Sequence, residues 1–272
     1  KSFTGKLSQC GLKPDRRTPS GIKAAIIREK GTNGEREMAY MLYLAGFDVK
    51  DVTMTDLVSG RETLEDINMV VYCGGFSNSD VLGSAKGWAG SFLFNPKAKA
   101  ALDNFYARED TLSLGVCNGC QLMMELGLIT PEDKKKGKML HNDSHKFESA
   151  FLGVTVPMNR SVMFGSLSGS KLGIWVAHGE GKFSLPYPED HYNVVLKYSY
   201  DEYPGNPNGS DYSVAGIASQ DGRHLAMMPH LERACFPWEN AYYPLDRKDN
   251  DQITPWMEAF VNARKWVEAH KK

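Results

Sequence analysis

Two cysteines and two histidine–glutamate pairs are the residues of this sequence whose types and spacing best suit chemistry. Cys117 and Cys120 lie three positions apart in LSLGVCNGCQLMM, where an apolar run passes into a helix-like one. Two histidines each precede a glutamate by two residues, His178 in VAHGEGKF and His230 in MMPHLERA. A thiolate, a histidine that moves protons and an acid that orients the histidine together form a nucleophilic centre.

The cysteine pair has three interpretations, of which metal binding is the weakest. A structural zinc site needs about four ligands, usually in two spaced pairs. The remaining cysteines, Cys10, Cys73 and Cys235, form no second pair, so we predict no metal site. A thioredoxin-like C-x-x-C is an alternative, because its first thiol would also lie at a helix N-terminus. Such motifs, however, usually open an early helix in a small domain.

The glycines around the first cysteine favour a nucleophile. Residues 115–119 read GVCNG, the thiol counterpart of the G-x-S-x-G nucleophile elbow, in which small residues let strand and helix pack around a sharp turn. The helix N-terminus favours a thiolate at Cys117. The backbone N–H of Asn118 would face an oxyanion on a carbonyl that Cys117 attacks. Cys120, one turn further on, is expected to be a small buried residue that faces away from the substrate.

Two histidines compete for the role of base. At positions i and i+2 of an extended segment both side chains point to one face, so a glutamate there can hold the imidazole tautomer. His178 with Glu180 and His230 with Glu232 satisfy this condition equally. The second pair follows a hairpin whose final strand, HLAMM, is placed to end near the elbow, and Pro229 fixes the turn. The residues alone favour the second pair only mildly, and both remain candidates.

Alternating apolar and amphipathic segments must position these residues. We expect apolar strands over 23–28, 47–52, 68–73 and 112–116, with helices over 35–45 and 95–108. This alternation predicts an α/β fold, a three-layer sandwich whose mostly parallel central sheet is flanked by helices. We also expect a smaller antiparallel β portion from runs at 149–156, 173–177, 194–200 and 214–228, and a closing helix over 255–270.

Composition limits the partners and the compartment. The 272 residues carry a formal net charge of -1, which gives no electrostatic footprint for nucleic acid or an acidic membrane surface. No apolar run approaches the roughly 20 residues that span a bilayer, and no signal peptide opens the chain. Five cysteines, an odd number without framework spacing, predict a reducing compartment, and we expect the cytoplasm.

The first twenty residues differ from the rest of the chain in composition and in their lack of periodicity. They mix Pro, Gly, Ser and basic residues without periodicity, so we predict a linker or lead-in from a preceding domain over 1–20 and one functional domain over 21–272. The chain begins with Lys1, which suggests a piece of a longer polypeptide.

These motifs resemble a known family. GVCNGCQ followed by MMPHLERA resembles the class I, or triad, glutamine amidotransferases. REKGTNGEREMAYMLYLAGF, VTMTDL, YCGGFSNSDVLGSAKGWA, VAHGEGKF and PWMEAFVNARKWV narrow the resemblance, over about residues 21–267, to the C-terminal glutaminase domain of the large, single-chain phosphoribosylformylglycinamidine synthases of purine biosynthesis. It implies a flavodoxin-like arrangement and hydrolysis of the glutamine side-chain amide through a cysteinyl thioester.

The resemblance also implies roles for individual residues. Its catalytic positions are Cys117, His230 and Glu232. Its oxyanion donors are Gly75, Phe76 and Asn118, and its substrate-binding positions are Gln121, His178, Gly179 and Glu180.

The resemblance further implies a partner. Ammonia would pass to a synthetase domain of the same polypeptide, which amidates formylglycinamide ribonucleotide with ATP and magnesium. We expect no cofactor in this chain, because GTNGE lacks the lysine of a P-loop. Two alternatives are another cysteine hydrolase of the same fold that acts on γ-glutamyl bonds, and a catalytically silent regulatory module.

Overall fold

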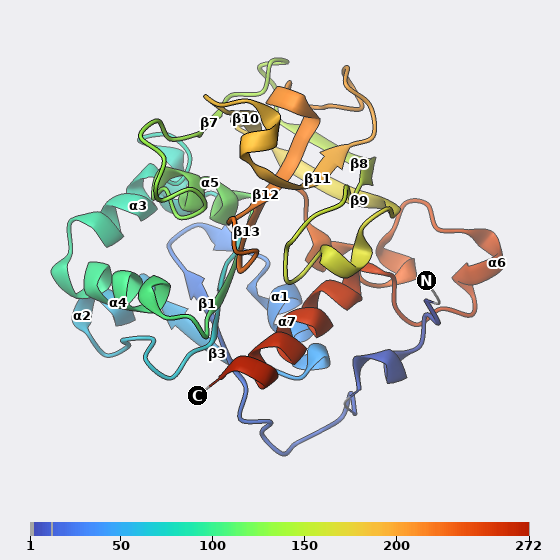
Figure 1. The fold of residues 1–272 in the computed structure, drawn as a ribbon, viewed down its shortest axis with the longest axis horizontal. Helices are drawn as coiled ribbons and strands as arrows, with labels where there is room; N and C mark the ends of the chain where they lie inside the picture. Colours follow the sequence, from blue (N-terminus) through green and yellow to red (C-terminus); the bar gives the residue numbers. More distant parts are fainter. Residues whose placement is uncertain (1–2, 12, 272) are drawn as a thin grey trace.

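A computed structural model describes residues 3–11 and 13–271, and its centre is one nine-stranded sheet (Figure 1). The strands run in the order β3, β1, β4, β6, β13, β12, β11, β8, β9. Their bounds are β1 (Lys23–Arg28), β3 (Asp48–Thr53), β4 (Met69–Tyr72), β6 (Leu112–Val116), β8 (Glu148–Thr155), β9 (Lys171–His178), β11 (Asn193–Tyr198), β12 (Val214–Ala218) and β13 (His224–Met227).

The direction of the strands changes in the middle of this sheet. Neighbours are parallel from β3 to β13 and antiparallel from β13 to β9. The predicted hairpin joins β12 to β13. The antiparallel runs therefore extend the central sheet, and they do not build a separate unit. Two short antiparallel pairs are additional, β2 (Thr32–Asn33) with β5 (Gly74–Gly75) and β7 (Lys138–Leu140) with β10 (Lys182–Ser184).

Helices cover the parallel half on two sides, which confirms the predicted three-layer α/β fold (Figure 1). On one side α1 (Glu35–Ala45) packs against α7 (Trp256–His270). On the other, α2 (Met54–Ser59) packs against α4 (Pro96–Ala107), α4 against α3 (Lys86–Leu93) and α3 against α5 (Asn118–Glu125), and α5 lies on β4, β6 and β13. A single further turn, α6 (Leu245–Lys248), precedes α7.

Helix α1 shows why the local sequence folds as expected. Its predicted apolar face, Met38, Met41, Leu42 and Ala45, is buried. The helix ends at Gly46, whose φ of 111° lies in the left-handed region that glycine adopts without a steric penalty. The spacing of the apolar residues accounts for the buried face of α1, and Gly46 accounts for its C-terminal end.

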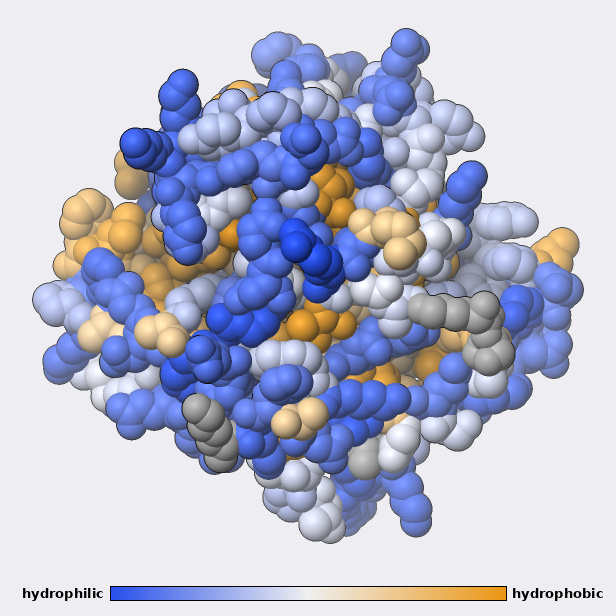
Figure 2. All heavy atoms as spheres, in the orientation of Figure 1, coloured by the Kyte–Doolittle hydropathy of each residue, from blue (hydrophilic) through white to orange (hydrophobic). Residues whose placement is uncertain are grey.

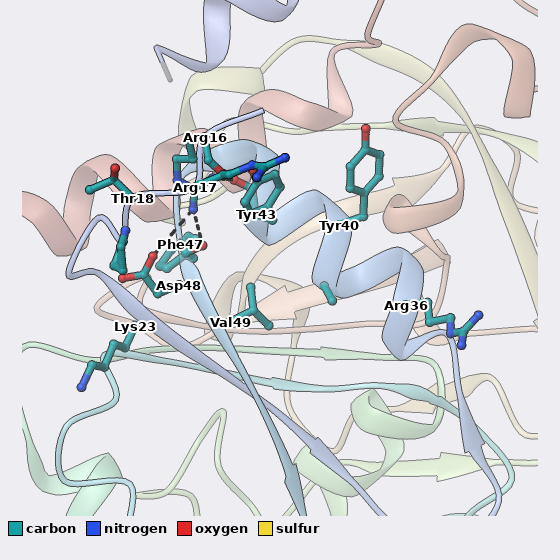
Figure 3. A pocket seen from close by; sticks show the side chains of 12 residues that line it. Arg16, Arg17, Thr18, Lys23, Arg36, Tyr40, Tyr43, Phe47, Asp48 and Val49 are labelled. Atoms are coloured by element: carbon teal, nitrogen blue, oxygen red, sulfur yellow. Dashed lines mark hydrogen bonds and ion pairs between the residues drawn. The ribbon is translucent and has the colours of Figure 1, made fainter. Parts of the chain in front are cut away.

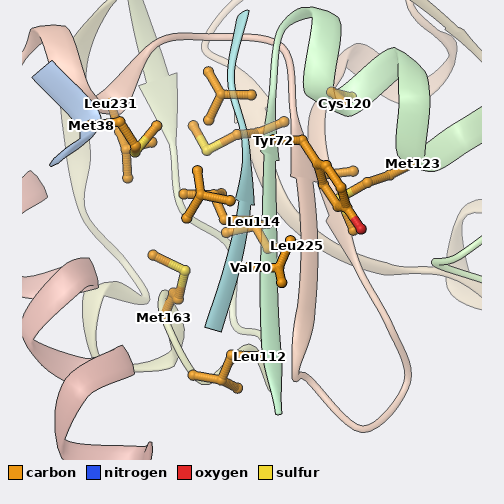
Figure 4. Close-up of a cluster of buried hydrophobic side chains, with 14 of the residues drawn as sticks. Met38, Val70, Tyr72, Leu112, Leu114, Cys120, Met123, Met163, Leu225 and Leu231 are labelled. Carbon is orange, nitrogen blue, oxygen red and sulfur yellow. The ribbon is translucent and has the colours of Figure 1, made fainter. Parts of the chain in front are cut away.

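The core lies between the sheet and its helices (Figure 4). Val70, Tyr72, Leu114 and Leu225 of the central strands are fully or almost fully buried, and each such side chain contributes about 1.5–3 kcal/mol through burial. Cys120 belongs to this cluster, and burial raises the pKa of its thiol. The prediction that Cys120 is a small core residue is confirmed.

The segment before β1 contacts the far end of the chain. The Leu7 N–H donates to Gln252 Oε1 over 3.0 Å, and Arg264 of α7 donates to the Cys10 carbonyl over 3.1 Å. The described part of this segment is thus packed on the domain, although its sequence has no periodicity.

The surface is mainly hydrophilic on the face drawn in Figure 2, with hydrophobic atoms visible in central depressions and at the left edge. Among the described residues, no helix has the length and apolar character needed to cross a membrane.

Candidate active site

Cys117 occupies the sharp turn between β6 and α5. Its φ of 54° and ψ of −107° are strained for a residue with a β carbon. A β carbon at Gly115 would lie 2.4 Å from the Gly119 carbonyl oxygen, and one at Gly119 would lie 2.0 Å from the Tyr72 carbonyl oxygen. The prediction that both glycines are needed for close packing of strand and helix is confirmed. The elbow holds the thiol at the carboxyl end of a parallel strand, where open α/β sheets bind ligands.

His230 is held by its glutamate. The His230 Nδ1 and Glu232 Oε1 atoms are 2.7 Å apart, and both residues are at most 2% exposed. The backbone differs from the extended segment that the sequence predicts. His230 pairs with Trp175 of β9, and its N–H donates to the Trp175 carbonyl over 2.9 Å. Residues 231–233 then form one 3-10 turn, which folds the Glu232 carboxylate back onto the imidazole.

The imidazole and the thiol meet at Gly74. A β carbon on Gly74 would lie 2.8 Å from His230 Cε1 and 3.4 Å from Cys117 Cβ, so only glycine leaves room there. Burial lowers the pKa of His230, but the charges of Glu232 and Cys117 outweigh burial and raise this pKa to about 10. This arrangement favours a protonated imidazole beside the sulfur atom, which is the acid that an amine leaving group requires.

The other pair is not joined. His178 ends β9 and is 2% exposed, and neither of its ring nitrogens has a hydrogen-bond partner among the described residues. The chain turns after His178, and the Glu180 carboxylate lies 3.3 Å from the Ser84 N–H and 3.8 Å from His141. Burial, followed by the positive charge of His230, lowers the pKa of His178 to about 4. Its imidazole is therefore neutral near pH 7.

The predicted oxyanion residues come from two segments. Asn118 begins α5, so its backbone N–H has no acceptor within the helix. Gly75 follows on β5 with a φ of 114°. The N–H of Phe76 donates to the Gly31 carbonyl over 2.8 Å, and it can serve as an oxyanion donor only after that bond breaks.

Two of the predicted substrate-binding residues, Gln121 and Glu180, are linked to Asn118 by hydrogen bonds. Gln121 is 6% exposed, and its Nε2 donates to the Glu180 carbonyl over 2.8 Å. Its Oε1 accepts from Asn118 Nδ2 over 2.9 Å. Gly179 lies in the turn between His178 and Glu180. The structure thus brings the α5 side chains and this turn together.

Sequence reasoning missed several residues at this centre. The Ala177 carbonyl lies 3.5 Å from the Cys117 sulfur, and Ser77 donates its N–H to Asn118 Oδ1 over 3.0 Å. Buried Asn142 donates to the His178 carbonyl, and buried Asn208 donates to the Gly181 carbonyl, each over 2.7 Å. No spacing rule finds them, because each comes from a different segment, and two act through backbone atoms and two through side-chain amides.

A separate groove lies elsewhere among the described residues. A groove of about 770 Å³ lies along α1 and β3, but Arg16 on its wall is occupied by the Tyr43 and Phe47 carbonyls (Figure 3). None of the predicted site residues lines this groove. Within residues 3–11 and 13–271, no three His, Cys, Asp or Glu side chains are arranged to hold a metal ion.

Known proteins are similar in sequence to this chain. A family model described as CobB/CobQ-like glutamine amidotransferase domain matches residues 21–267. The probable phosphoribosylformylglycinamidine synthase, chloroplastic/mitochondrial, of Arabidopsis thaliana is 44% identical in an alignment of 266 positions that covers 91% of this chain and 19% of that protein. The phosphoribosylformylglycinamidine synthase of Homo sapiens is 44% identical in an alignment of 279 positions, gaps included, that covers 92% of this chain and 21% of that protein. The chain spans about a fifth of these relatives.

Solved structures share the fold. PurLQS from Thermotoga maritima has a TM-score of 0.65 and 26% identity over 92% of this chain and 99% of that chain. A glutamine amidotransferase from Thermotoga maritima has a TM-score of 0.54 and 14% identity over 91% of this chain and 99% of that chain. At that identity, the second similarity concerns the fold alone.

Proposed function

We propose that this chain, which belongs to the family of CobB/CobQ-like glutamine amidotransferase domains, hydrolyses the side-chain amide of glutamine to glutamate and ammonia. One observation carries the proposal. A cysteine on a strained elbow stands beside a buried imidazole, which a buried carboxylate holds at 2.7 Å. This is the geometry of nucleophilic acyl transfer with a shared acid and base.

The reaction has two halves. The Cys117 thiolate attacks the amide carbon of glutamine, and the carbon–nitrogen bond breaks as His230 gives its proton to the leaving ammonia. A thioester remains on Cys117. Water then attacks the thioester carbon, His230 takes a proton from that water, and the thiolate leaves. The sum is glutamine plus water to glutamate plus ammonia, with the enzyme restored.

The remaining residues stabilise or hold the reacting groups. Glu232 keeps the His230 ring in place and favours its charged form. The backbone N–H groups of Asn118 and of Gly75 or Phe76 donate hydrogen bonds to the oxyanion in both half-reactions. Such donors stabilise the negative charge that develops in the transition state. Gln121 and the turn formed by His178, Gly179 and Glu180 hold the amino-acid portion of glutamine.

The ammonia has a proposed destination. The curated relatives carry the name of phosphoribosylformylglycinamidine synthase, and the matched region is about a fifth of their length. We infer that ammonia from this domain, residues 21–272, feeds the ATP-dependent amidation of formylglycinamide ribonucleotide in purine biosynthesis. A synthetase domain of the same polypeptide, reached through residues 1–20, would bind ATP and magnesium, and this chain needs no cofactor.

The proposed compartment is the cytoplasm. All five cysteines are free and buried, which suits a reducing environment.

Removal of the nucleophile tests the proposal. In the full-length enzyme Cys117→Ala is expected to abolish glutamine-dependent synthesis and to leave synthesis from added ammonium salt within about twofold, since ammonia bypasses the thiol. Cys120→Ala is the matched control, because it removes a thiol three residues away in the core, and it should keep glutamine-dependent activity. Glutamine-dependent synthesis that persists in Cys117→Ala would refute the proposal.

A further inference from the structure

The Asn118 side chain, which has no part in the proposed reaction, belongs to a chain of hydrogen bonds. Ser77 donates its backbone N–H to Asn118 Oδ1 over 3.0 Å. Asn118 Nδ2 donates to Gln121 Oε1 over 2.9 Å, and Gln121 Nε2 donates to the Glu180 carbonyl over 2.8 Å. Asn118 is fully buried and Gln121 nearly so. In such an environment each of these bonds costs free energy if it is left unmade.

The ends of this chain fix its direction. It begins at a backbone N–H, which can only donate, and ends at a backbone carbonyl, which can only accept. Each side chain between them must accept on one side and donate on the other, and an amide does both. Only one orientation of Asn118 and one of Gln121 satisfies all three bonds. A carboxylate in either position would leave two acceptors facing each other.

The chain joins the parts that must cooperate around the thiol. Ser77 follows two residues after Gly75, in the loop that carries the proposed second oxyanion donor. Glu180 belongs to the turn after β9. Asn118 stands between them as the residue next to Cys117. One residue therefore presents an oxyanion donor on its backbone and holds the loop of the other donor with its side chain.

The loop is also hydrogen-bonded to a second segment of the chain. On its other side, Phe76 and Asn78 donate their N–H groups to the carbonyls of Gly31 and Lys30, over 2.8 Å and 2.7 Å. These bonds tie the loop to the segment around β2. Asn118 is the tie from the nucleophile helix, so it sets the distance between the loop and the sulfur atom.

We propose that the Asn118 side chain is a positioning residue that sets the oxyanion loop against Cys117 through the Ser77 N–H. The inference rests on the proposed glutamine hydrolysis. Oxyanion donors act on the transition state, so loss of their alignment lowers kcat more than it raises KM. Asn118→Ala is expected to lower kcat by roughly 10- to 100-fold, with KM within about threefold. This loss is smaller than the roughly 10²- to 10³-fold cost of removing a donor, because the donor is displaced and not removed.

A second variant separates positioning from general damage. Asn118→Asp has nearly the same shape, but its ionised carboxyl cannot donate to Gln121 Oε1. When protonated, it restores both bonds, and burial favours the protonated form. The ratio of variant to native kcat should rise as pH falls for Asn118→Asp and stay flat for Asn118→Ala. Alkylation of Cys117 by iodoacetamide, which needs no oxyanion donor, should stay within about twofold of native in both variants.

One readout is independent of catalysis. Amide hydrogen exchange at Ser77 should be at least tenfold faster in Asn118→Ala than in the native chain, since the acceptor is lost. Unchanged Ser77 exchange would overturn the inference whether or not glutamine is hydrolysed. A loss confined to KM, or identical pH ratios for the two variants, would overturn it as well. A native protein that hydrolyses no glutamine, with faster Ser77 exchange in Asn118→Ala, would instead refute the proposed function alone.

Discussion

Two segments of this molecule have the same spacing of histidine and glutamate but different surroundings. In His230–Glu232 the carboxylate folds back onto the ring at 2.7 Å, and the imidazole lies beside the sulfur of Cys117. In His178–Glu180 the ring has no hydrogen-bond partner among the described residues, and the carboxylate turns toward Ser84. The first pair has the geometry that proton transfer requires, whereas in the second pair no acid is joined to the ring.

The difference comes from the backbone after each histidine. A 3-10 turn over residues 231–233 brings Glu232 under His230. After His178 the chain leaves β9 through Gly179, and the Glu180 carbonyl is taken by Gln121. Identical spacing therefore carries different chemistry, because the turn decides where the acid points.

The largest expected difference is between two single variants, in which either His230 or His178 is replaced by alanine. His230→Ala should lower kcat/KM for glutamine by at least about 10³-fold, because both halves lose their acid and base. His178→Ala should lower it by less than about tenfold, since that ring is neutral and only lines the site. Steady-state glutaminase assays of both variants measure the difference. Equal losses, or the larger loss in His178→Ala, would exchange the roles of the pairs.

Substitution of each glutamate by glutamine is a second test of the difference between the pairs. Glu232→Gln should lower kcat by roughly 10²- to 10³-fold, because an amide neither stabilises the imidazolium nor fixes its tautomer. Glu180→Gln should change kcat by less than about threefold, because its bond to Gln121 uses the backbone and its contact with His141 is partly exposed. A similar kcat for both variants would show that Glu232 does not orient the base.

The smallest effect is a divergent pH dependence of the two rings. Nitrogen NMR should find His178 titrating near its lowered pKa of about 4 and His230 near its raised pKa of about 10. The lowered pKa of His178 means that the unfolded state binds the proton first, so stability is lost as pH falls from about 6.5 to about 4. The raised pKa of His230 stabilises the fold fully below about 6.5, and this contribution is lost as pH rises through about 10.

Denaturant titrations from pH 4 to pH 10 measure these changes in the free energy of unfolding. His178→Gln should reduce the acid-side loss only, and His230→Gln the alkaline-side loss only. His224, whose pKa is also lowered to about 4, mainly by burial, keeps part of the acid-side loss in both variants. Two rings that titrate together near 6.5 would contradict the electrostatic difference between the pairs.

The sequence predicted the strands of the central sheet, helices α1, α4 and α7, and the elbow, because their signals are local. It did not predict helices α2 and α3 or the short strands β2, β5, β7 and β10. Strand β6 and helix α1 follow from apolar periodicity, and residues 115–119 follow from the small residues that a sharp turn needs. The choice between His230 and His178 could not be made from spacing, because it depends on a 3-10 turn and on the pairing of His230 with Trp175.

The contacts around the nucleophile were also beyond sequence reasoning. Ser77, Asn142 and Ala177 meet the site through backbone atoms or buried amides, and these groups leave no periodic pattern. The occupied N–H of Phe76 likewise depends on the pairing of β2 with β5. These contacts form only when segments that are distant in the sequence pack against one another.

The central claim is that Cys117 forms a thioester with the side-chain carbonyl carbon of glutamine while His230 gives its proton to the leaving ammonia. Intact-protein mass spectrometry after treatment with the glutamine analogue 6-diazo-5-oxo-L-norleucine tests it directly. We predict a single adduct on Cys117 in the native chain and in His178→Ala, and an adduct that forms at least about 10²-fold more slowly in His230→Ala. An adduct on another cysteine, or equal labelling rates in the two histidine variants, would contradict the account.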